Sequence, residues 1–199
     1  MLGNPSAVLA LVWTDYRLAL LFAVFIPLTL LIWSLVTRSE AIGLVMTIYW
    51  RVASLLAITV YLMIGGYSFA FITSLAAKIL IPLGLWFWAD LNEEIREQPK
   101  RALNLGFNAW RWAMTVYCAV GVVVQAVFLR CAFSNTFFQG GTCQAWFQPA
   151  LAFADVFHAN FESGFLGVLG IVALVFYVLY LGYFLFVKLG RQGRSALNH

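Results

Sequence analysis

Long apolar stretches separated by short polar segments run through the whole chain. A helix needs about 20 mostly apolar residues to cross a hydrocarbon core about 30 Å thick. The stretch 41–89 is broken only by Arg51 and Lys78, and as one straight helix it would measure about 73 Å. It must therefore fold back, and the expected turn is Gly65-Gly66-Tyr67-Ser68. The pattern predicts five membrane-spanning helices, at about 18–36, 44–64, 69–89, 110–129 and 165–187.

Composition excludes a soluble or a disordered protein. Of the 199 residues, 63% are hydrophobic and 10% are charged, whereas an average soluble domain is roughly half apolar and about a quarter charged. A disordered chain would need low hydrophobicity and high net charge. We therefore predict an all-α integral membrane bundle, one domain over residues 1–199. Its long outer loop, 130–164, is expected to carry an amphipathic helix that starts at Pro149 and lies on the membrane surface.

The distribution of basic residues predicts the orientation. Lys and Arg collect on the cytoplasmic side of a membrane, and five spans place the two termini on opposite faces. The face with the C-terminus would carry Arg38, Arg96, Lys100, Arg101, Lys188, Arg191 and Arg194; the opposite face would carry Arg17 and Arg130. The C-terminus is therefore expected in the cytoplasm and the loop 130–164 in the lumen or periplasm. The first residues lack a basic region and an A-x-A site, so no cleaved signal peptide is expected.

Two of the three cysteines fall in the outer loop. Cys131 and Cys143 enclose a short segment with Gly140-Gly141, and disulfides persist outside the cytoplasm. A Cys131–Cys143 disulfide is the expectation, and two free thiols in an apolar loop are the alternative. Cys118 lies within the fourth span and is expected to pack inertly.

Arg51 and Lys78 are candidate contact residues because each lies inside a predicted span. Both could extend their charged ends to the headgroups, or they could contact a carboxylate, a lipid phosphate or a pigment carbonyl. No predicted span contains Asp, Glu or His. Any acidic partner of Lys78 is therefore expected from elsewhere than the predicted spans. Because coupled transport usually relies on a titratable group within the membrane, a pump is disfavoured.

An acidic cluster follows the third span with helical spacing, at Asp90, Glu93, Glu94 and Glu97. If the third span continues as a helix, the four carboxylates share one face. A solvated surface is the plain interpretation. Docking of a basic partner and binding of a divalent cation are the alternatives.

Two further groups lie near the outer loop. His158 stands between Asp155 and Glu162, and is interpreted as a surface residue, a pH sensor, or a metal or chlorophyll ligand. Gly164, Gly167 and Gly170 share one face of the fifth span and would let another helix or a flat ring approach closely. Internal helix packing is the default for them, and contact with a partner is the alternative.

Motifs of the common enzyme classes are missing from the sequence. It has no G-x-S-x-G, H-E-x-x-H, P-loop, dinucleotide fingerprint or C-x-x-C. We assign no catalytic residue and no metal site. The net charge of +4 follows from the basic inner face, so membrane lipid is expected as a partner and nucleic acid is not.

Several segments together resemble a family of multi-pass membrane proteins of unknown function found in cyanobacteria. The resemblance covers nearly the whole chain, and the part around 131–148 matches least. The motifs have no known catalytic role, so no active site is transferred. They are LVWTDYR (11–17), YWRVASLL (49–56), LWFWADLNEEI (85–95), WRWAM (110–114), GFLG (164–167) and GRQGR (190–194).

The resemblance implies a photosynthetic host and the thylakoid membrane. The leading expectation is a non-enzymatic accessory or assembly factor of a photosynthetic complex. A small-solute channel or carrier and a pigment- or lipid-handling membrane enzyme are the alternatives. Chlorophyll and carotenoid are candidate ligands on this ground alone.

Overall fold

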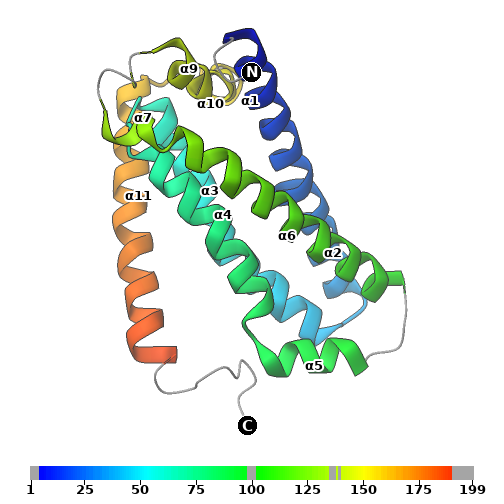
Figure 1. Cartoon of the computed structure of the whole chain (residues 1–199). Helices are drawn as coiled ribbons and strands as arrows, with labels where there is room; N and C mark the ends of the chain where they lie inside the picture. The colour runs from blue at the N-terminus through cyan, green and yellow to red at the C-terminus, as the bar shows by residue number, and fades with distance from the viewer. Residues whose placement is uncertain (1–4, 98–101, 135–137, 139, 190–199) are drawn as a thin grey trace.

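The computed structural model describes residues 5–97, 102–134, 138 and 140–189, and they form a bundle of long helices with no strand among them (Figure 1). The elements are α1 (Pro5–Ala19), a π-helical segment (Leu20–Phe25), α2 (Ile26–Val36), α3 (Glu40–Ile64), α4 (Ala70–Trp86), α5 (Ala89–Glu97), α6 (Ala102–Phe128), α7 (Arg130–Phe133), α9 (Gly141–Gln144), a 3₁₀ turn (Ala145–Phe147), α10 (Gln148–Phe157), α11 (Ser163–Tyr183) and a second π-helical segment (Phe184–Leu189). The prediction of an all-α membrane bundle is confirmed.

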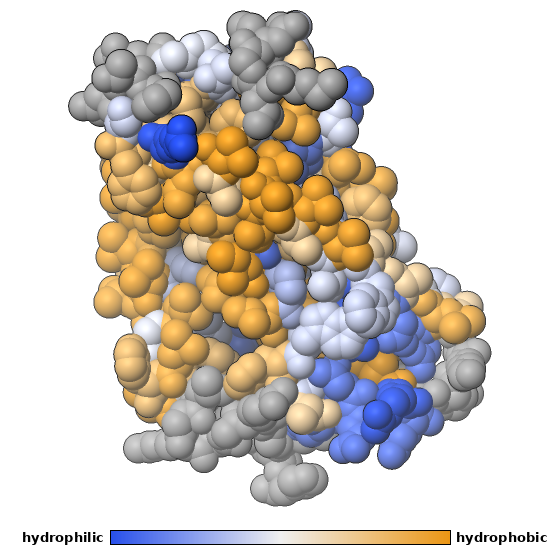
Figure 2. All heavy atoms as spheres, viewed as in Figure 1, coloured by the Kyte–Doolittle hydropathy of each residue, from blue (hydrophilic) through white to orange (hydrophobic). Residues whose placement is uncertain are grey.

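Four helical stretches in the described part of the chain are long and apolar enough to span a membrane: Ser6–Val36, Glu40–Ile64, Ala102–Phe128 and Ser163–Val187. The bent pair α4 and α5 makes a fifth if it is counted as one span. Apolar side chains cover the middle of the face in Figure 2, and hydrophilic ones gather at lower right, where α5 lies. An apolar surface of this extent is expected to face lipid.

The first span begins earlier than predicted. Its helix starts at Ser6, not near Leu18, so Asp15 and Arg17 lie within it. The polar residues at 14–17 mark no helix end, because backbone hydrogen bonds continue through them. The fourth helix is likewise longer than 110–129 and begins at Ala102. Of the basic residues that predicted the orientation, Lys100, Arg101, Arg191 and Arg194 lie outside the described residues.

Pro27 leaves the first helix straight enough to count as one span but changes its hydrogen bonding. The π-helical segment ends just before it, and Pro27 has no N–H for the carbonyl of Ala23 in α-helical register or of Phe22 in π-helical register. Tyr49 on α3 donates to the Ala23 carbonyl at 2.8 Å, and Trp110 on α6 donates to the Phe22 carbonyl at 2.8 Å. These two carbonyls, just before Pro27, therefore attach this helix to its two neighbours.

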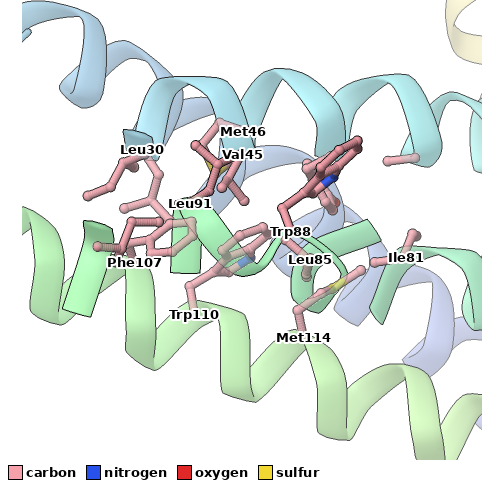
Figure 3. Packing of buried hydrophobic residues seen from close by; sticks show 14 of the residues in the cluster. Leu30, Val45, Met46, Ile81, Leu85, Trp88, Leu91, Phe107, Trp110 and Met114 are labelled. Atoms are coloured by element: carbon pink, nitrogen blue, oxygen red, sulfur yellow. The ribbon is translucent and has the colours of Figure 1, made fainter. Parts of the chain in front are cut away.

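Two apolar cores lie toward opposite ends of the bundle. One joins α2, α3, α4, α5 and α6 and includes Met46, Leu91 and Phe107, each fully buried (Figure 3). The other joins α1, α3, α4 and α6 to the outer-loop helices. The N-terminal end of α1 lies near α9 and α10, and α5 lies at the far end (Figure 1). The helices thus connect a cap formed by the loop 130–164 with a polar helix at the opposite end.

The third span breaks before the acidic cluster. α4 ends at Trp86, and α5 leaves it at an angle of 57°. The prediction that one helix continues from the third span into Asp90–Glu97 is therefore wrong. Leu91 and Ile95 are buried in the core, because turning α5 across the end of the bundle gives its apolar side a place to pack.

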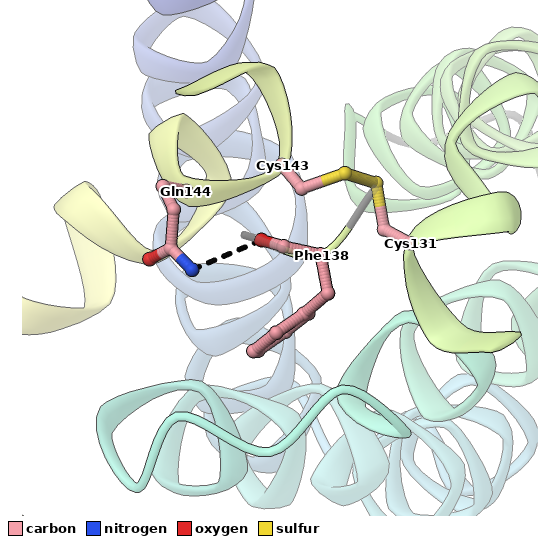
Figure 4. Close-up of a disulfide and its surroundings, with 4 residues drawn as sticks. All are labelled: Cys131, Phe138, Cys143 and Gln144. Carbon is pink, nitrogen blue, oxygen red and sulfur yellow. Dashed lines mark hydrogen bonds between the residues drawn. A yellow bond between two sulfur atoms is a disulfide. The ribbon is translucent and has the colours of Figure 1, made fainter. Parts of the chain in front are cut away.

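The outer cap is held by a disulfide and by stacked rings. Cys131 and Cys143 are bonded, as predicted, and Gln144 donates to the carbonyl of Phe138 at 3.0 Å (Figure 4). The Trp146 ring contacts the rings of Phe71 and Phe128. The predicted surface helix is α10. It begins at Gln148, and its Val156 and Phe157 are 74% and 69% exposed, as expected for side chains that face lipid.

Two of the three glycines of the fifth span pack inside the protein. The position of a Cβ on Gly167 would lie 2.7 Å from Cα of Gly65, and one on Gly170 would lie 3.0 Å from the backbone nitrogen of Leu62. Gly164 has nothing within 4 Å of the same position. The close approach is therefore between α11 and α3 of one chain, which agrees with the default interpretation of these glycines.

We expect Gly167→Ala to lower the free energy of unfolding by about 1–3 kcal/mol, because α11 must move away from α3 to make room for the methyl group. Gly164→Ala is the matched control, since it adds the same group to the same helix in open space. Reversible unfolding in mixed detergent micelles measures both. Equal stabilities of the two variants would contradict this account of the packing.

Candidate functional site

A buried ion pair lies where α1, α4 and α6 meet. Lys78 is at the midpoint of α4, and its side chain is 4% exposed. Its Nζ lies 3.1 Å from Oδ2 and 3.3 Å from Oδ1 of Asp15 on α1. Tyr117 on α6 donates its hydroxyl hydrogen to Oδ1 of Asp15 at 2.9 Å. The acidic partner of Lys78 thus lies outside the predicted first span 18–36, but inside the longer helix that the structure shows.

Local sequence makes room for this pair. The position of a Cβ on Gly121 would lie 2.9 Å from Cδ of Lys78, so a glycine in α6 lets the lysine stem pass. Side chains in helices lean toward the helix N-terminus, and in α4 that direction leads to the outer cap. Nζ lies 5.9 Å from the ring centroid of Tyr117 and 6.0 Å from that of Trp146. These two rings add cation–π stabilisation to the charge.

The side chain of Asp15 is only partly buried and faces a cavity. Its side chain is 25% exposed and lines a cavity of about 410 Å³ between α1, α3 and α10. Ligand sites of small molecules commonly span about 300–1,000 Å³ and are mostly apolar with a few polar groups. Apolar side chains such as Val24, Leu56 and Phe153 line this cavity, and the ion pair supplies its charged groups. The arrangement suits a small apolar molecule with one hydrogen-bonding group.

Of the buried polar groups near the outer end that have no hydrogen-bond partner among the described residues, two lie beside this ion pair. They are the side-chain amide of Gln125, which is fully buried on α6, and the indole N–H of Trp146. Gln125 lies one helical turn beyond Gly121, on the stripe of α6 that meets α4. Buried amides are usually paired, and pattern reasoning gave no sign of either group.

Arg51 lies apart from this ion pair. Its side chain is exposed, and its Nη1 donates to the hydroxyl of Tyr180 on α11 at 3.3 Å. Arg51 and Lys78 therefore belong to different sites, on different sides of α3 and α4.

His158 does not gather the two carboxylates that flank it in sequence. α10 ends at Phe157 and Glu162 precedes α11, so the three residues do not share one helix. In the described part of the chain, Nε2 of His158 lies 3.1 Å from the hydroxyl of Tyr61, and neither Asp155 nor Glu162 forms an ion pair with the imidazole. No cluster of three His, Cys, Asp or Glu suited to a metal occurs among the described residues.

The acidic cluster is presented by a firmly held helix. Glu93 and Glu97 are exposed, and Asp90 and Glu94 are half-buried. Arg111 on α6 stacks its guanidinium 3.9 Å from the ring centroid of Trp86 and donates to the side-chain oxygen of Asn92. Sequence reasoning did not single out Arg111, although a basic residue between Trp110 and Trp112 is a signal for such stacking.

We expect Asp15→Asn to reduce the free energy of unfolding by about 2–3 kcal/mol, because it leaves Lys78 buried without a counter-charge. The loss falls below the about 3–5 kcal/mol of a fully buried pair because Asp15 is 25% exposed. Lys78→Met should cost less, since Asp15 is 25% exposed and keeps its hydrogen bond from Tyr117. In the double variant the loss should be smaller than the sum of the two single losses, measured by the same unfolding assay. Simple additivity would show that the pair does not interact.

Comparison with known proteins gives a family and no activity. The family model described as "Protein of unknown function (DUF3177)" matches residues 9–197. No curated protein and no solved structure matches the chain. The matched range includes the ion pair, the cavity, α5 and α11, so all the features above lie within the family domain. This chain is a member of the DUF3177 family of proteins of unknown function.

Proposed function

We propose that this protein is a non-enzymatic accessory or assembly factor of a photosynthetic membrane complex, and that α5 is its docking element. The thylakoid setting and the kind of complex rest on the resemblance of the sequence motifs. The docking role rests on one observation, the exposed acidic face of a helix that is fixed rigidly at the polar end of the bundle.

Several contacts hold α5 in one place. Besides its buried leucine and isoleucine, its backbone accepts a hydrogen bond at the Ile95 carbonyl from the Asn104 amide, at 2.9 Å. The Asn92 amide donates to the Trp86 carbonyl at 3.1 Å across the bend. A helix tied at both ends and along one side presents its outer carboxylates at fixed positions, so a partner meets them without an ordering cost.

The chemistry of α5 favours a basic partner segment. Glu93 and Glu97 are solvent-exposed, and Arg96 lies 3.4 Å from Glu93 in a pair whose side chains are 77% and 65% exposed. Exposed ion pairs contribute roughly 0–1 kcal/mol each, so docking requires several of them at once and weakens as salt increases.

The proposed orientation places α5 in the cytoplasm and the disulfide-bonded cap in the lumen. The excess of basic residues on the α5 side and the Cys131–Cys143 bond both support it. In inside-out thylakoid vesicles, which expose the lumenal face, an impermeant maleimide should label Asp155→Cys and spare Glu97→Cys. The opposite labelling pattern would place α5 in the lumen and would contradict the proposed orientation.

The docking role predicts which charges matter. After mild solubilisation of native membranes, we expect the partner complex to co-purify with the wild-type protein and to be lost from the variant Glu93→Gln/Glu97→Gln. The control Asp155→Asn/Glu162→Gln removes two exposed acids from the opposite end of the bundle and should keep the partner. Co-purification that is equal in all three proteins would exclude α5 as the docking element.

The cavity beside Asp15 favours a second candidate function, the binding of a pigment or lipid. Its apolar lining and its volume of about 410 Å³ fit part of such a molecule better than a solvated ion. The same purified protein distinguishes the two functions. A bound pigment is seen by its absorbance, and it should be displaced by Ala57→Trp, which fills the cavity from α3, whereas the docked complex should remain.

A further inference from the structure

Arg51 is a charged residue in the middle of a membrane-spanning helix. It lies eleven residues after Glu40 and thirteen before Ile64, the two ends of α3. At 1.5 Å per residue its Cα is about 16 Å from the nearer end. The helix is about 37 Å long and the hydrocarbon core about 30 Å thick, so Arg51 starts about 12 Å inside the apolar layer. That is more than its side chain can span.

No carboxylate in the described part of the chain lies within ion-pair distance of Arg51. The described contact of its guanidinium is the hydroxyl of Tyr180, which is a neutral partner. Lys78 provides the contrast, because its charge is neutralised by Asp15 within the same protein. An isolated charge in the hydrocarbon region is unfavourable and marks a site for a ligand or a counter-ion.

The surroundings of Arg51 form a recess of about 320 Å³ between α3, α4 and α11. Apolar and aromatic side chains line it, among them Leu80, Leu83 and Phe184. Tyr177 donates to the carbonyl of Val52 at 3.4 Å and closes the recess on its outer side. Figure 2 shows a hollow on this face, between the lower part of α11 and α4.

We propose that this recess binds an acidic membrane lipid. The anionic headgroup lies against the guanidinium of Arg51 and the hydroxyl of Tyr180, and an acyl chain lies along the apolar wall of the recess. Arginine presents its N–H groups in a planar fork that matches the two oxygens of a phosphate or carboxylate. The lipid supplies the negative charge that the described chain does not supply. This site does not depend on the docking role of α5.

The charge of the recess and its location in the bundle indicate which molecule it binds. The recess opens on the apolar surface of the bundle, where lipid is the surrounding molecule, and its one charge is positive. A neutral lipid fills the apolar wall but leaves Arg51 unpaired. Free inorganic phosphate pairs with Arg51 but leaves the apolar wall empty. An acidic lipid satisfies both parts of the site at once.

Native mass spectrometry of the full chain, released from detergent with defined lipids, tests the proposal. We expect the wild-type protein to retain phosphatidylglycerol over phosphatidylcholine of the same acyl chains, and inorganic phosphate at equal concentration not to compete. Arg51→Gln should reduce the retention of phosphatidylglycerol on the order of tenfold, because charge-assisted hydrogen bonds are roughly twice as strong as neutral ones. Arg51→Lys should keep part of it, since the positive charge remains.

Two further variants keep the outcome decisive. Arg17→Gln removes an exposed arginine from the first span, away from the recess, and should leave the lipid preference unchanged. Leu83→Trp fills the recess from a residue that is 57% exposed, so it should lose the lipid while the fold persists, even if Arg51→Gln does not fold. An unchanged preference in Arg51→Gln and Leu83→Trp would overturn the proposal. Displacement of the lipid by inorganic phosphate would show a simple anion site and would also overturn it.

Discussion

Polar groups inside this bundle depend mainly on partners within the protein, because the acyl chains of lipids offer none. The first helix shows the consequence most clearly. Two of its carbonyls, at Phe22 and Ala23 just before Pro27, accept hydrogen bonds from other helices, and its Asp15 carries a charge into an apolar layer. Tyr49, Trp110 and Lys78 satisfy these groups from α3, α6 and α4. A helix with few buried side chains of its own is thereby attached to each of its neighbours by directional bonds.

The same constraint distinguishes two of the cations within the spans, Lys78 and Arg51. Lys78 is enclosed by a carboxylate, two aromatic rings and a glycine that gives it space. Such an arrangement fixes the position of the helices more than it stabilises them, since desolvation offsets much of the attraction between buried charges. Arg51 has a hydroxyl and an open recess instead. Lys78 is thus neutralised within the protein, whereas Arg51 has no counter-ion among the described residues.

Sequence reasoning predicted the helical bundle, the turn at Gly65-Gly66 and the Cys131–Cys143 disulfide, because each depends on local chemistry. Apolar length predicts a span, and positive φ at Gly66 is a property of glycine in turns. The ion pair was missed because the boundary of the first span was drawn at Leu18. A hydropathy pattern marks the apolar part of a helix and not the full length over which its backbone is hydrogen-bonded. Asp15 precedes the apolar part and was therefore placed outside the span.

The remaining differences depend on contacts between distant segments. The bend before α5 follows from the packing of Leu91 and Ile95 on α3 and α6, which no local pattern contains. His158 was grouped with Asp155 and Glu162 by helical spacing, but the chain turns after Phe157 and the imidazole meets Tyr61 instead. Spacing rules hold within an unbroken helix, and these residues cross a helix end.

The glycine contact between α11 and α3 also has a mechanical consequence. α11 meets the backbone of α3 near Gly167 and Gly170, whereas farther along, beside the recess, the side chains of Tyr177 and Tyr180 reach across to α3. From Gly167 to Phe184 the helix extends about 25 Å. A tilt of about 5° around that backbone contact would therefore carry its far end about 2 Å outward. The glycine contact thus fixes the point about which any tilt of the fifth helix would turn.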